Sequence, residues 1–234
     1  MNRSEINLLL FDFDGTLVNT TPLILRTFRA TWEQVFGFVL DDACYIRTFG
    51  MLLPTAMKEL IEQCLAEQRI ARPDDPPAFL NAKAEEALLA YRAFNLQWHD
   101  EMIRPFDGVD DTLRELRARR FKLGVVSSKM RAGLERGLNI YHMAELFDVI
   151  VAGDDCENHK PHPEPLLRAI EKAPASRSEA IYIGDSTHDI VAGRAARVMT
   201  AAATWGPFPR AELEELRPDL LFNHPKDLLI VFSR

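Results

Sequence analysis

Short apolar runs alternate with longer amphipathic stretches through much of this chain. Most of the runs end in small polar or acidic residues, a pattern typical of strands that are buried on both faces of a parallel sheet. Such strands are predicted at residues 6–11, 122–126, 149–152, 180–183 and 199–204. Stretches of helix length lie between them, for example at 110–120 and 163–172. This alternation predicts an α/β fold with a doubly wound parallel sheet.

The pattern changes between residues 17 and 92, where no convincing strand is found. Apolar positions with helical spacing occur at residues 23–36, 55–68 and 79–92. The proline-rich segment 72–77 is expected to be a loop, because proline breaks helices. An insertion directly after the first strand lies over the carboxyl ends of the strands, where such sheets bind ligands. We therefore expect a helical cap domain at 17–92 that acts as a lid on a catalytic core formed by 1–16 and 93–234.

Composition and charge narrow the function classes. Apolar residues make up 47% of the chain and charged residues 27%, which is typical of globular proteins and unlike disordered or fibrous ones. Lysine and arginine total 28 against 35 aspartate and glutamate, and the net charge of −7 disfavours nucleic acid as a partner. The apolar runs are far shorter than the ~20 residues of a membrane span, so we expect no membrane association and a cytoplasmic location.

Three cysteines, Cys44, Cys64 and Cys156, are spread along the sequence. Their odd number and wide spacing differ from the dense pairing of a secreted, disulfide-rich protein. None belongs to a Cys-x-x-Cys pair or to a recognisable nucleophile motif. The cysteines are therefore predicted to be free thiols that are buried as small apolar residues.

The first candidate chemistry lies at the end of the first predicted strand, in Phe11-Asp12-Phe13-Asp14-Gly15-Thr16. Two aspartates two positions apart share one face of a continuing strand. Gly15 indicates a sharp turn, which can direct both carboxylates and exposed backbone into one crevice. The alternative is an acidic turn that only caps the strand, and the position at the carboxyl end of a strand favours a functional site.

This segment resembles motif I of the haloacid dehalogenase superfamily of phosphohydrolases, and three further motifs follow in the order of that family. Ser127-Ser128-Lys129 is similar to the second motif. Lys160, in His159-Lys160-Pro161, matches the third, and Gly184-Asp185-Ser186-Thr187-His188-Asp189 matches the fourth. The resemblance spans nearly the whole chain and implies a Rossmann-like core with an inserted helical cap of the C1 type.

The resemblance implies roles for the residues of motif I. Asp12 would attack phosphorus and form an aspartyl-phosphate, with its second oxygen on a metal ion. Asp14 would protonate the leaving oxygen and later accept a proton from the hydrolytic water, and its backbone carbonyl would be a metal ligand. Gly15 and Thr16 would bind substrate at the exposed backbone of the turn.

The other three motifs receive roles in the same way. Ser127 would hydrogen-bond the phosphoryl oxygens, and the alternative is a serine that satisfies local backbone at a strand end. Ser128 would also contact substrate, although many relatives carry asparagine there. Lys160 would pair with the nucleophile and the transferring phosphoryl group. Asp185 would bind the metal, and Asp189 would hold a metal-bound water or the lysine; for both, an acidic helix N-terminus is the alternative.

Charge neutralisation predicts the cofactor. Asp12, Asp14, Asp185 and Asp189 carry four negative charges when ionised, whereas Lys160 supplies one positive charge. A divalent cation is therefore required before a phosphate dianion can approach a negative nucleophile. Oxygen ligands together with a phosphate substrate favour Mg2+.

The acid two residues after the nucleophile favours phosphoryl transfer over carbon–halogen cleavage, and a cap shields a small site from water. A small phosphorylated metabolite is the expected substrate. Segments that resemble the bacterial inorganic pyrophosphatase subgroup are Asn19-Thr20, 91–95, His99-Asp100, Asp154-Asp155, 160–165 and His188-Asp189. The preferred interpretation is an inorganic pyrophosphatase. The alternatives are a phosphoglycolate phosphatase, a sugar-phosphate phosphatase or mutase, and a catalytically silent phosphate-binding protein, which would be expected to have lost its motif residues.

Three cations of the predicted cap, Arg47, Lys58 and Arg92, are candidates to bind the distal part of a substrate, since a second phosphate requires positive charge. The alternative is that they are solvated charges on helix surfaces. His99 and His188 are expected to be partly buried, hydrogen-bonded histidines.

One departure from the family pattern affects a helix end. Many relatives close the helix after the fourth motif with Ala-Ala-Gly, whereas this chain has Ala195-Ala196-Arg197. The glycine that favours a left-handed helix end is therefore absent. We expect an effect on local geometry more than on chemistry.

Overall fold

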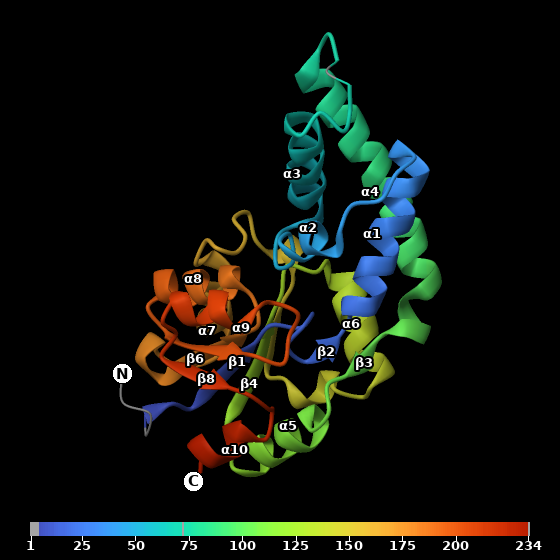
Figure 1. The fold of residues 1–234 in the computed structure, drawn as a ribbon. Coiled ribbons are helices and arrows are strands. Elements are labelled where there is room, and N and C mark those ends of the chain that lie inside the picture. Colours follow the sequence, from blue (N-terminus) through green and yellow to red (C-terminus); the bar gives the residue numbers. More distant parts are fainter. Residues whose placement is uncertain (1–4, 72, 234) are drawn as a thin grey trace. The chain divides into compact units, whose positions relative to one another are not determined.

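The computed structural model describes residues 5–71 and 73–233, and the chain divides into two units (Figure 1). The first unit consists of Met1–Asn19 and Arg104–Arg234, and the second consists of Thr20–Ile103. Each unit has a hydrophobic cluster of its own.

Two short strands mark where the second unit is inserted. The strands β2 (Val18–Asn19) and β3 (Arg104–Pro105) pair antiparallel, and the inserted chain runs between them. The helix before β3, α4 (Pro76–Met102), is much longer than the amphipathic stretch seen in the sequence. Because this helix continues to Met102, the inserted unit ends later than the predicted range of 17–92.

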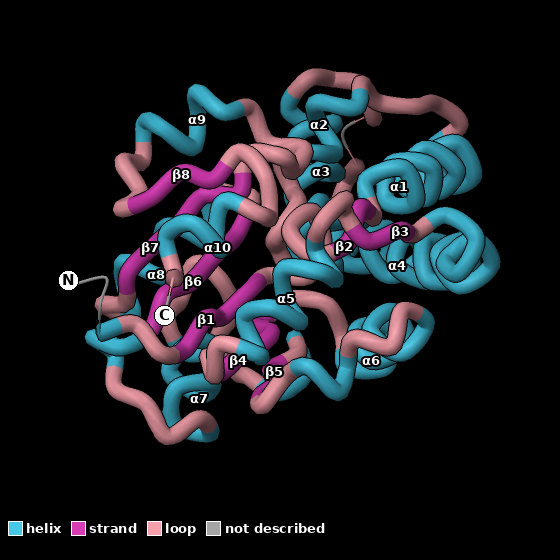
Figure 2. The backbone as a smooth tube through the Cα atoms, turned by 90° about the horizontal axis from the view of Figure 1, so that it is seen from below, coloured by secondary structure: helices cyan, strands magenta, loops and turns pink. Residues whose placement is uncertain are grey.

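The described part of the first unit contains a six-stranded parallel sheet. Its strands are β1 (Leu8–Phe11), β4 (Lys122–Val126), β5 (Val149–Val151), β6 (Ala180–Gly184), β7 (Met199–Ala203) and β8 (Leu220–Phe222). The order across the sheet is β5-β4-β1-β6-β7-β8 (Figure 2). In the central strand, Phe11 is in register with Val125 on one side and with Ile183 on the other. The predicted parallel sheet is confirmed, and β8 is a strand that the sequence did not predict.

Helices cover both faces of this sheet. They are α5 (Val109–Ala118), α6 (Arg131–Ile140), α7 (Glu164–Lys172), α8 (Thr187–Ala196), α9 (Arg210–Glu215) and α10 (Asp227–Val231). Leu8 and Leu10 of β1 belong to a cluster with residues of α7 and α8. The next residue of the strand, Phe11, lines a small cavity with Leu113 of α5 and Leu228 of α10. Alternate residues of one strand therefore pack on opposite layers, as in a doubly wound fold.

The second unit is helical throughout its described residues apart from loops. Its helices are α1 (Thr21–Phe36), α2 (Asp42–Ile46), α3 (Leu53–Ala66) and α4. Aromatic residues dominate its core: the Phe28 ring stacks on Tyr45 at 5.0 Å and meets Tyr91 edge-on at 5.0 Å, and Trp32 lies 5.7 Å from Tyr45. Such pairs add to the stability that area burial provides. The predicted helical insertion thus has its own core.

The start of α4 corrects one prediction. Pro76 and Pro77 were expected in a loop, but they form the first turn of the helix, where the missing proline N–H costs nothing. Asp75 caps this end, because its carboxylate accepts a hydrogen bond from the N–H of Ala78 at 3.1 Å. Arg72, at the start of the expected loop, lies outside the described residues.

The helix α8 ends in a left-handed residue although no glycine is present. Arg197 has φ 59° and ψ 42°, and its N–H donates to carbonyls of the last turn. This is the conformation that glycine favours, and a side chain in it costs on the order of 1 kcal/mol. The helix therefore ends in the left-handed conformation without glycine, and this residue carries backbone strain.

Two further features concern the cysteines and the helices. Cys44, Cys64 and Cys156 are free thiols; Cys64 is buried, and the other two are partly buried. No helix in the described ranges is both long enough and apolar enough to cross a membrane.

Candidate active site

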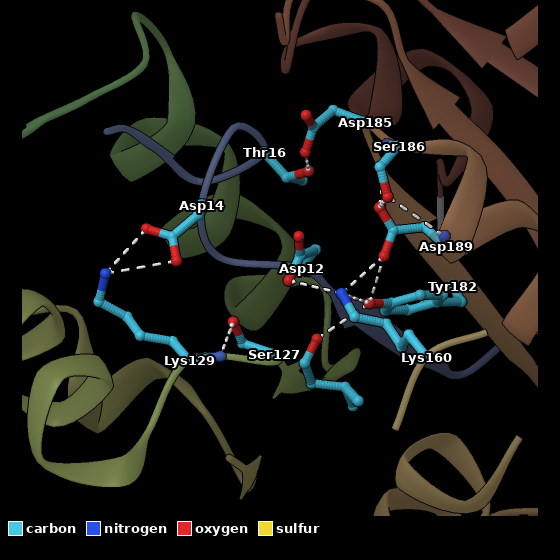
Figure 3. Close-up of polar contacts among 11 residues, drawn as sticks. Asp12, Asp14, Thr16, Ser127, Lys129, Lys160, Tyr182, Asp185, Ser186 and Asp189 are labelled. Atoms are coloured by element: carbon cyan, nitrogen blue, oxygen red, sulfur yellow. Dashed lines mark hydrogen bonds and ion pairs between the residues drawn. The ribbon is translucent and has the colours of Figure 1, made fainter. Parts of the chain in front are cut away.

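The ends of three neighbouring strands bring the motif residues together (Figure 3). Asp12 follows β1, Ser127 follows β4 and Asp185 follows β6. The sheet ladder continues one residue beyond the strands: the N–H of Asp12 donates to the carbonyl of Ile183 at 2.9 Å, and the N–H of Ser127 donates to that of Val151 at 3.0 Å. The parallel register therefore sets the backbone positions of Asp12 and Ser127, and with them the positions of their side chains.

A tight turn follows the first strand. Gly15 has φ 84°, and its N–H donates to the carbonyl of Val18 at 2.9 Å. A Cβ at Gly15 would lie 2.3 Å from a carboxylate oxygen of Asp185, so both the backbone angle and the space require glycine. On the far side of this turn, Thr16 Oγ1 donates to Asp185 Oδ1 at 2.7 Å. The turn thus packs motif I directly against the fourth motif.

Three buried carboxylates form an acidic cluster. Each of Asp12, Asp185 and Asp189 offers an oxygen within 4.8 Å of the others. Burial, together with the other carboxylates, raises the pKa of Asp12 to about 7 in spite of Lys160. Burial and the charges of Asp189 and Asp12 raise the pKa of Asp185 well above its ordinary value. A cation among these groups would relieve their repulsion.

The cluster meets the requirements of a metal site. Oδ1 of Asp12 is buried and accepts no hydrogen bond within the described residues, although Lys160 Nζ lies 3.0 Å away as an ion-pair partner. Asp185 is enclosed by backbone, because a Cβ at Gly206 would lie 2.3 Å from its Cβ and one at Gly15 would meet its carboxylate. Carboxylate oxygens held in this way suit a hard divalent cation.

Lys160 is buried between two of these carboxylates. Its Nζ lies 3.0 Å from Asp12 Oδ1 and 2.7 Å from Asp189 Oδ1, and it donates to the Tyr182 hydroxyl at 3.1 Å. Burial opposes the charge, but Asp12 and Asp189 raise the pKa of Lys160 above its ordinary value. The ammonium group is therefore charged at neutral pH and fixed beside Asp12.

Both carboxylate oxygens of Asp189 accept hydrogen bonds. Oδ1 accepts from Lys160, and Oδ2 accepts from the N–H of Ser186 at 2.9 Å and from its hydroxyl at 2.6 Å. Although burial opposes ionisation, Lys160 and Ser186 hold the pKa of Asp189 below its ordinary value. This carboxylate is thus ionised and serves to hold the lysine.

Asp14 points away from this cluster. Its carboxylate oxygens lie 3.0 and 3.3 Å from Nζ of Lys129, whereas Asp12 faces Lys160 (Figure 3). The two aspartates of motif I therefore contact different lysines. One belongs to the buried charge network, and the other belongs to a partly exposed ion pair.

Comparison with known protein families shows to which of them this chain belongs. A family model described as "Haloacid dehalogenase-like hydrolase" matches residues 9–203, which include every motif named above. The chain belongs to the haloacid dehalogenase-like hydrolase family.

Relatives within this family are similar over the whole length. Pyrophosphatase PpaX of Bacillus cereus (strain B4264) is 37% identical over 229 residues, covering 98% of this chain and 97% of that protein. Pyrophosphatase PpaX of Bacillus anthracis is 35% identical over 229 residues, which again cover 98% of this chain and 97% of that protein. The family and these relatives identify the chain as a phosphatase-type hydrolase.

Solved structures share the fold of this chain. A putative phosphoglycolate phosphatase from Lactobacillus plantarum matches with a TM-score of 0.81 and 29% identity, covering 97% of this chain and 99% of that one. A putative haloacid dehalogenase-like hydrolase from Bacteroides fragilis matches with a TM-score of 0.83 and 27% identity, covering 95% of this chain and 99% of that one.

Some residues of this haloacid dehalogenase-like site were not expected from the sequence. Tyr182 is fully buried, and its hydroxyl lies 2.9 Å from the carbonyl of Val126 and 3.0 Å from Asp189 Oδ1. Trp205 Nε1 donates to the carbonyl of Thr16 at 2.9 Å and so supports the motif I turn. A tyrosine in an otherwise aliphatic buried strand was a usable signal, because its hydroxyl needs a partner.

The remaining predicted residues lie as follows. Ser127 is buried, and its Oγ accepts a hydrogen bond from the N–H of Lys129 at 3.2 Å; Ser128 is half-buried. Arg47, Lys58 and Arg92 are exposed residues of the second unit, and their contact with substrate stays a prediction.

The two histidines differ in burial. His99 is buried in the second unit, and its Nδ1 lies 2.8 Å from Asp100 Oδ1. His188 is half-buried in α8 of the first unit. Burial and an acidic partner agree with the structural role expected of His99.

Proposed function

We propose that this protein is a magnesium-dependent phosphohydrolase that acts on a small phosphorylated metabolite through an aspartyl-phosphate, with inorganic pyrophosphate as its preferred substrate. The observation that carries the chemistry is the buried ion pair of Lys160 with Asp12 beside the carboxylate of Asp185. The substrate is supported by the 37% identity to a pyrophosphatase over 98% of the chain.

In the first step of the proposed reaction, a carboxylate oxygen of Asp12 attacks phosphorus while the bond from phosphorus to the leaving oxygen breaks. Asp14 transfers its proton to that oxygen. Ser127 and Lys160 bind the phosphoryl oxygens and stabilise the charge that they carry in the transition state. The products of this step are the aspartyl-phosphate and the protonated leaving group.

In the second step, a water molecule attacks phosphorus, and Asp14, now a carboxylate, accepts one of its protons. The bond between phosphorus and the Asp12 oxygen breaks, which releases phosphate and restores both aspartates. Mg2+, held by Asp12, Asp185 and the backbone carbonyl of Asp14, would supply the positive charge that lets a phosphate dianion approach. Asp189 would keep Lys160 in place in both steps.

The helical unit is proposed to act as a lid over this chemistry. Its chain begins at Thr20, directly after the motif I turn, in which the N–H of Val18 donates to the carbonyl of Phe13 at 3.0 Å. Such an insertion can exclude water from a small substrate. The exposed cations Arg47, Lys58 and Arg92 are the proposed contacts for the distal part of the substrate.

Phosphoglycolate hydrolysis is the second candidate. It is favoured by the match to a putative phosphoglycolate phosphatase over 97% of the chain. A sugar-phosphate phosphatase or mutase would use the same core residues. A silent phosphate-binding protein is disfavoured because Asp12, Asp14, Lys160 and Asp185 are all present.

The test is phosphate release, with and without Mg2+, from pyrophosphate, phosphoglycolate, hexose phosphates and nucleotides at equal concentration. Magnesium-dependent release that is fastest from pyrophosphate supports the proposal. A preference for phosphoglycolate keeps the mechanism and replaces the substrate. Asp185→Ala should raise the Mg2+ concentration needed for half-maximal rate, and an unchanged requirement removes Asp185 from the metal ligands.

A further inference from the structure

The lysine of the second motif, Lys129, has no role in the mechanism above, yet its ammonium contacts both carboxylate oxygens of Asp14 at 3.0 and 3.3 Å. Both side chains are partly buried, with 14% of the lysine and 24% of the aspartate exposed. The exposed ion pair of Arg114 with Asp110 in the same unit leaves 47% and 46% of its side chains accessible, so the pair of Lys129 with Asp14 is markedly more enclosed.

The whole of Lys129 is fixed by its surroundings. Its backbone N–H donates to Ser127 Oγ at 3.2 Å, and its carbonyl accepts from the N–H of Gly153 at 2.8 Å. Its stem runs along Gly133 of α6, where a Cβ would lie 3.3 Å from Lys129 Cε. The ammonium also lies 5.7 Å from the centre of the Phe13 ring. The side chain is thus positioned from backbone to tip.

The geometry places this ammonium one contact away from the leaving group. In the proposed function, on which this step rests, Asp14 makes a hydrogen bond to the leaving oxygen. Because Lys129 contacts both oxygens of Asp14, a group that reaches Asp14 also comes within reach of Lys129. Lys160 cannot take this place, because it is buried between Asp12 and Asp189.

The charge balance agrees with this position. When Asp14 carries the proton that it donates in the first step, the three other carboxylates face two ammonium groups, Lys160 and Lys129, which leaves one negative charge. One divalent cation turns this into one positive charge, which the transferring phosphoryl dianion already exceeds. The negative charge of the leaving group is therefore unbalanced, and Lys129 is the partly exposed cation beside it.

We infer that Lys129 binds the leaving group of the substrate and favours leaving groups that carry a negative charge of their own, either a second phosphate or a carboxylate. Charge-assisted contacts of this kind are worth about 10- to 100-fold in a rate or binding constant. The same fold then selects pyrophosphate and phosphoglycolate over phosphate esters of neutral alcohols.

The test compares two substrates that differ in the charge of the leaving group, pyrophosphate and ethyl phosphate. Lys129→Met should lower kcat/KM for pyrophosphate at least 10-fold more than kcat/KM for ethyl phosphate, and Lys129→Arg should retain the preference for pyrophosphate. Lys122→Met is the matched control: it removes one lysine of the same unit, whose Nζ donates to the carbonyl of Pro174 outside the site. It should leave both substrates unchanged.

An equal loss on both substrates would show that Lys129 acts only by positioning Asp14, and no loss on either would show that it is solvated; both results overturn the inference. The binding of pyrophosphate with Mg2+ to Asp12→Asn protein, measured by calorimetry, gives a readout without turnover. Adding Lys129→Met should weaken that binding about 10-fold or more, and unchanged binding contradicts the inference. Failure of the proposed function is seen separately, as wild-type protein that releases no phosphate from any substrate.

Discussion

The two units of this chain bury different kinds of side chain. The core of the first unit is mostly aliphatic, and near the carboxyl ends of its strands it buries the charged residues Asp12, Lys160, Asp185 and Asp189. The core of the second unit contains stacked aromatic rings, such as Phe28 on Tyr45. Among the described residues of the second unit, no aspartate, glutamate, lysine or arginine is buried.

This difference shows which part of the chain carries constraints beyond stability. Buried charges are costly, and replacing them by apolar groups often stabilises a protein. The proposed chemistry accounts for their presence in the first unit, whereas the second unit is stabilised by apolar burial. Charges of the second unit lie on its surface, where their identity affects stability little.

The largest effect is expected for Asp12, the proposed nucleophile. Asp12→Asn should lower phosphate release by about 10⁴-fold or more, because the amide cannot form the acyl phosphate. The melting temperature should not fall, since the substitution removes one of three buried carboxylates that repel each other. Substantial residual activity, or a variant that unfolds, would contradict the view that the buried charges of the first unit serve chemistry while apolar burial provides stability.

The same substitution in both units sharpens the comparison. Lys160→Met leaves Asp12 and Asp189 buried without their cation and should lower the free energy of unfolding by about 3–5 kcal/mol. Lys58→Met, on the exposed face of α3, should change it by less than about 0.5 kcal/mol. Urea denaturation measures both. Similar losses in the two variants would contradict the account.

The dependence of stability on pH tests the buried carboxylates of the first unit. Burial raises the pKa of Asp12 from 3.8 to about 7 in the folded protein, so between these values the folded state holds a proton that the unfolded state has lost. The contribution of this group to stability therefore falls as pH rises from about 4 to 7, on the order of 4 kcal/mol in total without a cation.

A divalent cation binds the ionised carboxylates and opposes that loss. Mg2+ should therefore raise the melting temperature more at pH 7.5 than at pH 5.5. Differential scanning calorimetry at both pH values, with and without Mg2+, gives the four melting temperatures that this comparison requires. A rise that is equal at the two pH values would argue against a cation among Asp12, Asp185 and Asp189.

The smallest effect concerns backbone strain away from the chemistry. Arg197→Gly places glycine in the left-handed conformation at the end of α8 and should stabilise the protein by about 0.5–1 kcal/mol. Arg197→Ala keeps the strain and removes only the side chain, so it should leave stability nearly unchanged. If both variants have the same stability, the strain at this position is negligible.

Local signals explain what was predictable from the sequence. The strands β1, β4, β5, β6 and β7 are apolar runs with polar ends, and the order of the four motifs identified the residues at their ends. The strand β8 is only Leu220–Phe222, and β2 and β3 have two residues each, so no periodic pattern could reveal them. The start of α4 was missed because proline was treated as a breaker at a position where it begins a helix.

Long-range contacts explain what was not predictable in the site. Lys129 meets Asp14 across 115 positions, and Trp205 meets Thr16 across 189. No local pattern links such residues, because strand order and loop paths bring them together. Motif order identified the residues of the buried cluster, whereas the contact of Asp14 with a different lysine required the fold.

The central claim, that Asp12 forms an acyl phosphate during turnover, is tested most directly by trapping that intermediate. Protein turning over pyrophosphate with Mg2+ is quenched in acid and reduced with borohydride, which converts an aspartyl-phosphate to homoserine, and its peptides are analysed by mass spectrometry. The account predicts homoserine at position 12 and nowhere else, and none in the Asp12→Asn protein. Homoserine at Asp14 or Asp185, or its absence under conditions in which the acyl phosphate accumulates in a related phosphatase, would contradict it.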